Sequence, residues 1–270
     1  YQGLSKDLSA IEPPIWAALL AQHVLSKGYG ARILDCEADL LSPEETAKAI
    51  SDIDAKLTVF VVYGQQPSAS TQNMQGVHDA LEVLKEQWPT KKVLLTGLYP
   101  SAVSRLTMQD EKTDFVCQGE DSRICFTKPA PLIKQNELQN ELPGMAWDLL
   151  PMDKYRTSNW HAMSNDNDRM PFASLYTSLG CPFQCSFCCI NAPFGHNNVE
   201  NWDLGRNKFR YWDPDFIISE FDKIREMGIR NVKIADEMFV MNKQHFLKLC
   251  NNIIEHDHDF NIWAYARIDT

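Results

Sequence analysis

The sequence lacks long apolar stretches, an excess of basic residues and a recognisable secretory segment. No run of 18 or more apolar residues occurs, so we expect no membrane-spanning helix. The 26 Lys and Arg residues are outnumbered by 36 Asp and Glu, which gives a net charge of −10 and a pI near 5.2. A nucleic-acid-binding surface is typically basic, so that class of function is disfavoured. The chain starts at Tyr1 without a signal peptide, and its eight cysteines therefore predict a reducing, cytosolic compartment.

Several common catalytic signatures are also missing. No Ser–His–Asp arrangement, phosphate-binding loop or basic aromatic patch stands out in the sequence. At 270 residues the chain is nevertheless long enough to form two domains, each with its own core. The function must therefore be sought in another motif.

Three cysteines, Cys181, Cys185 and Cys188, lie within the eight residues Cys-Pro-Phe-Gln-Cys-Ser-Phe-Cys. Spacings of four and three let a short loop turn three sulfurs toward one point, which indicates a metal site. Structural zinc takes four protein ligands, and Cys189 or His196 can supply the fourth. An iron–sulfur cubane held by three thiolates instead leaves one iron open to a small molecule. A disulfide is disfavoured because the remaining cysteines are scattered.

Residues 1–126 alternate helix and strand patterns. We expect helices after Pro14, after Ser42 and over 72–87, and strands over 31–34, 57–63, 92–96 and 114–117. The strand at 57–63 is almost continuously apolar, which suits burial on both faces. Strands separated by helices predict a parallel, doubly wound sheet that binds ligands at the carboxyl ends of its strands.

Residues 127–170 contain several prolines and predict a linker, within which the segment 142–152 is expected to be a packed loop anchored by Trp147. Beyond it, the patterns predict strands over 172–178, 232–235 and 262–266, and helices over 214–227 and 242–256. This βαβαβ order is that of the first half of a TIM-like barrel. Catalytic groups in α/β barrels cluster at the carboxyl ends of the strands.

The spacing CxxxCxxC, with Phe187 directly before the last cysteine, resembles the radical S-adenosylmethionine (SAM) superfamily. The resemblance implies a 4Fe-4S cluster on Cys181, Cys185 and Cys188 whose open iron binds SAM. It further implies reductive cleavage of SAM to a deoxyadenosyl radical, an external electron donor such as flavodoxin or ferredoxin, and a small-molecule substrate. Cys189 is then expected to be a buried thiol that leaves the fourth iron open.

The same resemblance implies the SAM contacts. Phe187 is expected near the adenine, Asp236 and Glu237 near the ammonium group, and Arg267 near the carboxylate. For the acidic pair the alternative is an exposed acidic turn, and for Arg267 it is an ordinary surface ion pair. Further along, the run of residues 256–259, His-Asp-His-Asp, can bind a metal, although a solvated helix end is the more common interpretation.

Three segments of the first part resemble the cobalamin-binding domain that precedes the radical SAM domain in one branch of the superfamily. They begin at Tyr1 (Tyr-Gln-Gly-Leu-Ser), at Tyr63 (Tyr-Gly-Gln-Gln-Pro-Ser-Ala-Ser) and at Asp114 (Asp-Phe-Val-Cys-Gln-Gly-Glu). The resemblance implies a set of cobalamin contacts, namely Ser68, Ser70, Thr71, Gly97, Tyr99 and Gly119. Because the motif Asp-x-His-x-x-Gly is absent, no histidine is expected on the cobalt, and His23 is expected on a helix surface.

Compared with that family, the chain lacks a leading strand, is cut short after Glu120, and ends where further barrel units would follow. We therefore expect a fragment. It comprises a truncated doubly wound (Rossmann-like) cobalamin-binding-type domain over 1–126, the linker, and the first half of a partial TIM-like radical SAM barrel over 171–270. A weakened or lost cobalamin site follows from the truncation. The expected activity is cobalamin-dependent methylation, cyclisation or rearrangement at an unactivated carbon. The rival is a non-catalytic metal-binding or scaffold protein with structural zinc or an inert iron–sulfur site.

Overall fold

The computed structural model describes residues 10–64, 69–119, 138–158, 169–183, 185–188, 190 and 209–269. These residues fall into two compact units. The first unit is built from residues 39–133 and 182–207, and the second from residues 2–38, 134–181 and 208–270. The domain boundaries expected at 126 and 170 stay a prediction. No helix among the described residues combines the length and the apolar character needed to cross a bilayer.

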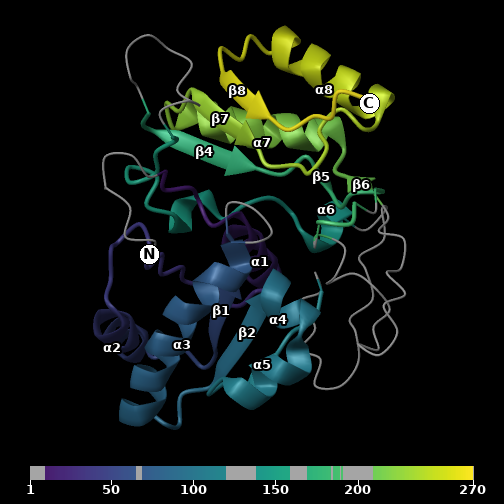
Figure 1. Cartoon of the computed structure of the whole chain (residues 1–270). Coiled ribbons are helices and arrows are strands. Elements are labelled where there is room, and N and C mark those ends of the chain that lie inside the picture. The colour runs from purple at the N-terminus through teal and green to yellow at the C-terminus, as the bar shows by residue number, and fades with distance from the viewer. Residues whose placement is uncertain are drawn as a thin grey trace. The chain divides into compact units, whose positions relative to one another are not determined.

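The first unit contains one parallel sheet in the order β1-β2-β3, with helices between its strands (Figure 1). The elements are α2 (Pro43–Ile53), β1 (Thr58–Val62), α3 (Ala69–Gln87), β2 (Val93–Gly97), α4 (Leu98–Ala102), α5 (Ser104–Asp110) and β3 (Phe115–Val116). The doubly wound, parallel arrangement predicted for this part is confirmed. Helix α2 begins as expected, because the Ser42 side chain accepts from the Glu45 amide and the Glu45 carboxylate accepts from the Ser42 amide.

Two sequence-based expectations for the strands before β2 are wrong. Residues 31–34, predicted as a strand, are not paired in any sheet of the described part of the chain. A short segment becomes a strand only where another strand's backbone is available to pair with it. The strand β1 was expected to be buried on both faces, yet Val59 is 43% exposed. The reason is that β1 lies at an edge of the three-stranded sheet.

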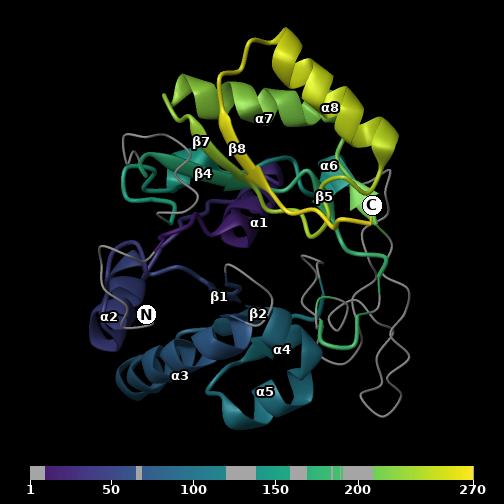
Figure 2. The same cartoon turned by 45° about the horizontal axis from the view of Figure 1, so that its top comes forward.

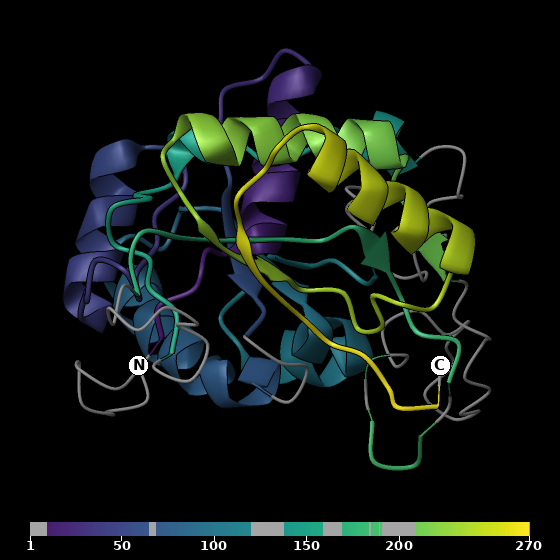
Figure 3. The ribbon, with the colours of Figure 1, turned by 90° about the horizontal axis from the view of Figure 1, so that it is seen from above.

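The second unit contains a parallel sheet in the order β4-β7-β8, and Figures 2 and 3 show α7 and α8 lying together over one face of it. Its longer elements are α1 (Ile15–Ser26), β4 (Phe172–Leu175), α7 (Pro214–Glu226), β7 (Asn231–Ile234), α8 (Lys243–Glu255) and β8 (Asn261–Ala264). The βαβαβ half barrel predicted from the sequence is confirmed. One predicted strand, 172–178, is interrupted: after β4 a second short strand, β5 (Ser178–Leu179), pairs antiparallel with β6 (Arg210–Tyr211).

The two faces of this sheet differ in character. Strand residues in register across β4, β7 and β8 point to the same face. One face carries the apolar rows Ala173–Val232–Ile262 and Leu175–Ile234–Ala264, and Leu175 lies beside Phe216 of α7. The other face carries the rows Phe172–Asn231–Asn261 and Ser174–Lys233–Trp263. The polar face is therefore the one turned away from α7 and α8.

Glu220 of α7 anchors the segment that joins the two predicted domains. This carboxylate is only 2% exposed, and one of its oxygens accepts from the Met145 amide at 3.1 Å and from the Trp147 indole at 2.9 Å. The short helix α6 (Leu138–Glu141) and the 3₁₀ turn η2 (Trp147–Leu149) flank these contacts. The packed loop anchored by Trp147 is thus confirmed. Gly144 has φ +90°, and a β-carbon there would lie 2.5 Å from Glu220, so only glycine fits.

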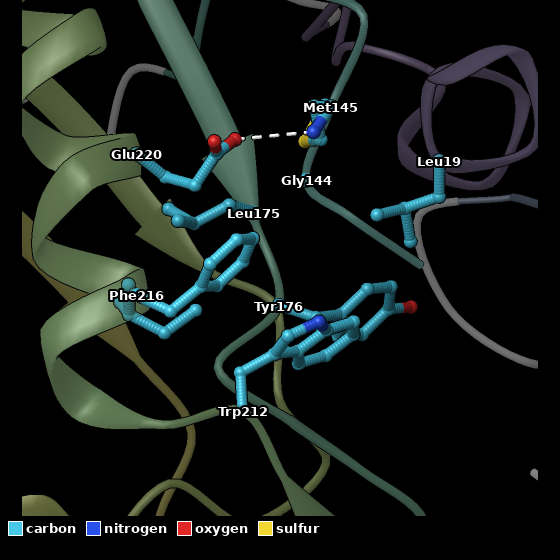
Figure 4. Close-up of a pocket in the computed structure, with 9 residues that line it drawn as sticks. Leu19, Gly144, Met145, Leu175, Tyr176, Trp212, Phe216 and Glu220 are labelled. Carbon is cyan, nitrogen blue, oxygen red and sulfur yellow. Dashed lines mark hydrogen bonds between the residues drawn. The ribbon is translucent and has the colours of Figure 1, made fainter. Parts of the chain in front are cut away.

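Beside this anchor lies a small apolar cavity of about 10 Å³, lined among others by Leu19, Tyr176, Trp212 and Glu220 (Figure 4). Such a volume holds at most a single water. Nearby, His23 of α1 is 8% exposed and its ring nitrogen bonds to the Glu141 carbonyl. The expectation of a surface histidine is therefore wrong, because α1 packs this side of the helix into the second unit rather than toward solvent.

Candidate active site

The carboxyl ends of β4 and β7 are joined by one buried carboxylate. Asp236, two residues beyond β7, is 0% exposed. One of its oxygens accepts from the backbone amides of Thr177 and Ser178 at 2.6 and 3.0 Å, and the other accepts from both hydroxyls at 2.6 Å. Four hydrogen bonds therefore hold the backbone turn between β4 and β5. That turn leads to Cys181 three residues later, so Asp236 positions the entrance to the cysteine loop.

Asp236 is consequently not part of an exposed acidic turn, which corrects one of the two alternatives drawn from the sequence. Burial raises the pKa of this carboxyl, while the hydrogen bonds from Ser178 and Thr177 act in the opposite direction. Both of its oxygens are used inside the protein. Of the acidic pair, this leaves Glu237 as the carboxylate available to a ligand.

Glu237 is partly buried next to Asp236. Burial raises the pKa of Glu237 to about 7, the charge of Asp236 raises it as well, and Lys233 lowers it. A carboxyl with such a pKa changes its charge close to neutral pH, which is typical of groups at functional sites. The Tyr176 hydroxyl lies in the same electrostatic environment: burial and then Glu237 raise its pKa well above the ordinary value.

A buried ion pair lies on the polar face of the sheet, and the sequence analysis missed it. Lys233 of β7 is 3% exposed, and its ammonium lies 2.7 Å from the carboxylate of Glu12. The same nitrogen is 5.1 Å from the ring of Trp263 and 5.7 Å from that of Tyr265. A lysine inside a short buried strand was the signal that could have revealed this group, since buried lysines require partners.

None of the three cysteines of the motif is fully buried. Cys185 and Cys188 share a tight turn, in which the Cys188 amide donates to the Cys185 carbonyl at 3.0 Å. Cys181 is grouped with the second compact unit and the two later cysteines with the first. The accessible thiols fit an iron–sulfur cluster, and the ligation of one cluster by all three stays a prediction. Cys189 and His196 lie outside the described residues.

The remaining residues predicted to contact SAM differ in their surroundings. Arg267 forms a two-pronged ion pair with Asp269, at 2.8 and 2.6 Å, and both side chains are substantially exposed. The surface ion pair expected as the alternative is therefore present. Phe187 is 90% exposed, so its ring is accessible to a ligand.

The residues predicted to contact cobalamin lie at the carboxyl edge of the first unit's sheet, except Ser68, which is outside the described residues. The Ser70 hydroxyl donates to the Val62 carbonyl and accepts from the Tyr99 amide at 3.0 Å. A β-carbon on Gly97 would lie 2.2 Å from Val62, and the Gly119 amide donates to Ser101. Ser70, Tyr99 and Gly119 thus form hydrogen bonds within the protein and Gly97 is closely packed, whereas Thr71 is exposed. This arrangement fits cobalamin only in part.

Sequence comparison finds related proteins, although no family model matches the chain. An uncharacterized methyltransferase of Pyrococcus horikoshii is 24% identical over 288 residues, covering 96% of this chain and 56% of that protein. The anaerobic magnesium-protoporphyrin IX monomethyl ester cyclase of Cereibacter sphaeroides is 21% identical, with 94% of this chain and 42% of that protein covered. The chain thus spans about half the length of these curated relatives.

Structural comparison points to the same class. The fold is similar to that of TsrM from Kitasatospora setae, a radical S-adenosylmethionine methyltransferase solved with its tryptophan substrate and a SAM analogue bound. The TM-score is 0.62 at 14% identity, over 97% of this chain and 53% of that one. TsrM has also been solved with cobalamin and a 4Fe-4S cluster bound. The fold of this chain is therefore similar to that of a radical SAM methyltransferase that binds cobalamin and a 4Fe-4S cluster. The resemblance first drawn from Cys181, Cys185 and Cys188 is confirmed.

Replacing Asp236 by Ala should destabilise the protein by about 3 kcal/mol or more, because four buried donors would lose their acceptor. Urea unfolding followed by circular dichroism measures the change. The matched control is Asp52→Ala, whose side chain is 65% exposed and pairs with Lys48, and which should change stability by less than about 1 kcal/mol. Equal effects of the two substitutions would contradict the positioning role of Asp236.

The raised pKa of Glu237 predicts a pH-dependent stability difference. A carboxyl whose pKa rises from 4.5 to about 7 on folding contributes stability that is fully present below pH 4.5 and is lost as the pH rises through 7. Glu237→Gln removes this loss, so the variant should gain about 2–3 kcal/mol relative to the wild type between pH 5 and pH 8. Parallel stability profiles of the two proteins, as expected for the exposed control Glu226→Gln, would count against the prediction.

Proposed function

We propose that this chain is the cluster-binding part of a radical SAM enzyme, in which Cys181, Cys185 and Cys188 hold a 4Fe-4S cluster. When bound, the cluster supplies the electron for the reductive cleavage of SAM to a deoxyadenosyl radical. The observation that carries the proposal is three accessible thiols directly beyond a strand turn that Asp236 holds with four hydrogen bonds. The similarity in fold to a radical SAM methyltransferase supports it.

The residues around the motif have separate roles in this proposal. Glu237 accepts the SAM ammonium group, because Asp236 is committed to the turn. A cation beside Glu237 favours its ionised form, so SAM binding should lower the pKa of Glu237 and release a proton near neutral pH. Phe187, which is exposed, covers the adenine. Arg267 releases its ion pair with Asp269 and binds the SAM carboxylate instead.

The relatives support a proposal for the reaction class of the whole protein. One relative is named as a methyltransferase and another as a cyclase, so methylation or cyclisation at an unactivated carbon of a small molecule is the activity we propose. An external electron donor, such as flavodoxin or ferredoxin, would reduce the cluster. Since the chain spans about half of these relatives, residues that recognise the substrate are to be sought in the rest of the protein as well.

Substituting any one of the three motif cysteines by Ala should abolish the iron content and the broad visible absorbance of anaerobically reconstituted protein, because a cubane on two thiolates loses its anchoring. Iron and sulfide analysis with absorption spectroscopy provides the measurement. Cys189→Ala is the matched control and should retain the cluster and SAM cleavage. Full iron retention in the triple variant would refute the ligand set, and stoichiometric zinc without sulfide would support the structural zinc site instead.

A second prediction concerns cobalamin, which we propose binds this chain weakly. The hydroxyl of Ser70 and the amide of Gly119 already form hydrogen bonds within the protein, so they contribute few hydrogen bonds to a bound ligand. Equilibrium dialysis of hydroxocobalamin against the purified chain should give a dissociation constant above the micromolar range, a binding free energy weaker than about −8 kcal/mol. Micromolar or tighter binding that becomes weaker in Thr71→Ala would contradict this prediction. It would show that the carboxyl edge of the first unit's sheet forms a complete cobalamin site.

A further inference from the structure

A second group of metal-ligating side chains lies at the opposite edge of the half barrel. Asp222 belongs to α7, His256 is the C-cap of α8, and His258 lies in the loop that leads to β8. Each of the three offers a ligand atom within 4.8 Å of the other two, and no other such trio occurs among the residues that the structure describes. The loop precedes β8, whereas Asp236 and Glu237 follow β7, so the candidate active site does not include this group.

The spacing of the donor atoms matches a tetrahedral cation. The Asp222 carboxylate oxygen lies 2.7 Å from the His258 Nε2 and 3.7 Å from the His256 Nδ1. Zinc binds nitrogen and oxygen ligands at about 2.0–2.2 Å, which places neighbouring ligand atoms of a tetrahedral site about 3.3 Å apart. The two distances lie on either side of this value, so small side-chain movements suffice to admit the ion.

The surroundings hold His258 in place and leave a path for the ion. The His258 side chain is 0% exposed, and its ring lies 6.2 Å from that of Phe221 and 5.2 Å from that of Phe260. Asp222 and His256 are each about half exposed, so a cation can reach the site from solvent. The loop backbone is also fixed, because the His258 amide donates to the Ile253 carbonyl at 3.1 Å.

Nearby cations are engaged elsewhere. Arg225 donates to the backbone carbonyl of His256 at 3.0 Å, and Arg230 pairs with Asp259. The His258 Nδ1 is buried and has no hydrogen-bond partner among the described residues. A metal binds at Nε2 only when this nitrogen carries no proton, so protons compete with the ion and binding should weaken at low pH.

We propose that Asp222, His256 and His258 form a binding site for a divalent cation of the zinc class, with water as the fourth ligand. Two imidazoles and one carboxylate suit Zn²⁺ better than Mg²⁺ or Ca²⁺, which prefer oxygen ligands. The ligands come from α7 and from the end of α8. The bound ion therefore ties these two helices together and stabilises the half barrel rather than taking part in its chemistry.

Isothermal titration of Zn²⁺ into the untagged, metal-free chain tests the proposal. Because the thiols of the cysteine motif are also expected to take up added zinc in the metal-free chain, the wild type is compared with two variants. Each variant changes one half-exposed ligand, Asp222→Asn or His256→Ala. His258 is left unchanged because its burial makes loss of folding the expected result. Each variant should lose one zinc equivalent or bind it at least about tenfold more weakly, and the zinc-induced rise in melting temperature should shrink accordingly.

The matched control is Asp259→Asn, which lies in the same loop, is exposed and pairs with Arg230. It should bind zinc as the wild type does. Identical zinc stoichiometry and affinity in the wild type, Asp222→Asn and His256→Ala would overturn the proposal. An equal loss in Asp259→Asn would do so too, because it would indicate only a general attraction of cations to an acidic surface. None of these readouts depends on the iron–sulfur cluster or on SAM cleavage.

Discussion

The buried carboxylate of Asp236 is the interaction on which the candidate active site depends. A carboxylate without solvent is costly unless all its lone pairs are used, and here four donors from Thr177 and Ser178 use them. The same bonds fix how the chain leaves β4 and enters the cysteine loop. Stability and site geometry are therefore coupled: a change that weakens this network misplaces Cys181 even if the strands persist.

The half barrel carries its apolar packing and its polar groups on different faces of the sheet, and its two candidate binding sites at different edges. Apolar rows such as Ala173–Val232–Ile262 pack under α7 and α8, where Ile217, Phe221 and Ile224 are almost fully buried. The opposite face holds the Lys233–Glu12 pair beside the aromatic ring of Trp263. Burying such a pair is favourable only when partners are well placed, so this face is built for polar contacts. The candidate SAM-binding residues lie at the carboxyl edge, and the proposed zinc site lies at the amino edge.

The first unit shows how close packing limits ligand contacts. Gly97 lets β1 and β2 approach so closely that a β-carbon would meet Val62 at 2.2 Å. Ser70 then joins the end of β1 to the start of α4 through its hydroxyl. The same glycine and serine that the family resemblance assigns to cobalamin are here required by the fold itself. A ligand at this edge must compete with, or build upon, contacts that already exist.

Much of this protein was determined by local sequence. Several features depend only on neighbours a few residues away in the sequence: the capping box at Ser42, the apolar stripes of α7 and α8, and the spacing of Cys181, Cys185 and Cys188. The helices, the parallel order of the strands and the class of protein could therefore be predicted from them. The prediction of a strand over 31–34 was wrong because a strand needs another strand to pair with, and the local sequence does not show whether one is available.

Only the tertiary structure decided which polar groups are buried and with whom. Asp236 and Glu237 are adjacent and chemically alike, yet one is locked in a network while the other has a pKa raised to about 7. Lys233 meets Glu12 across 221 positions of sequence, and His258 is enclosed by aromatic rings although its neighbour His256 faces solvent. Burial and long-range pairing arise from packing between elements. A short segment can signal that a polar group is buried, as the strand around Lys233 does, but it does not encode which distant residue pairs with that group. These pairings determine which of the candidate residues are available for chemistry.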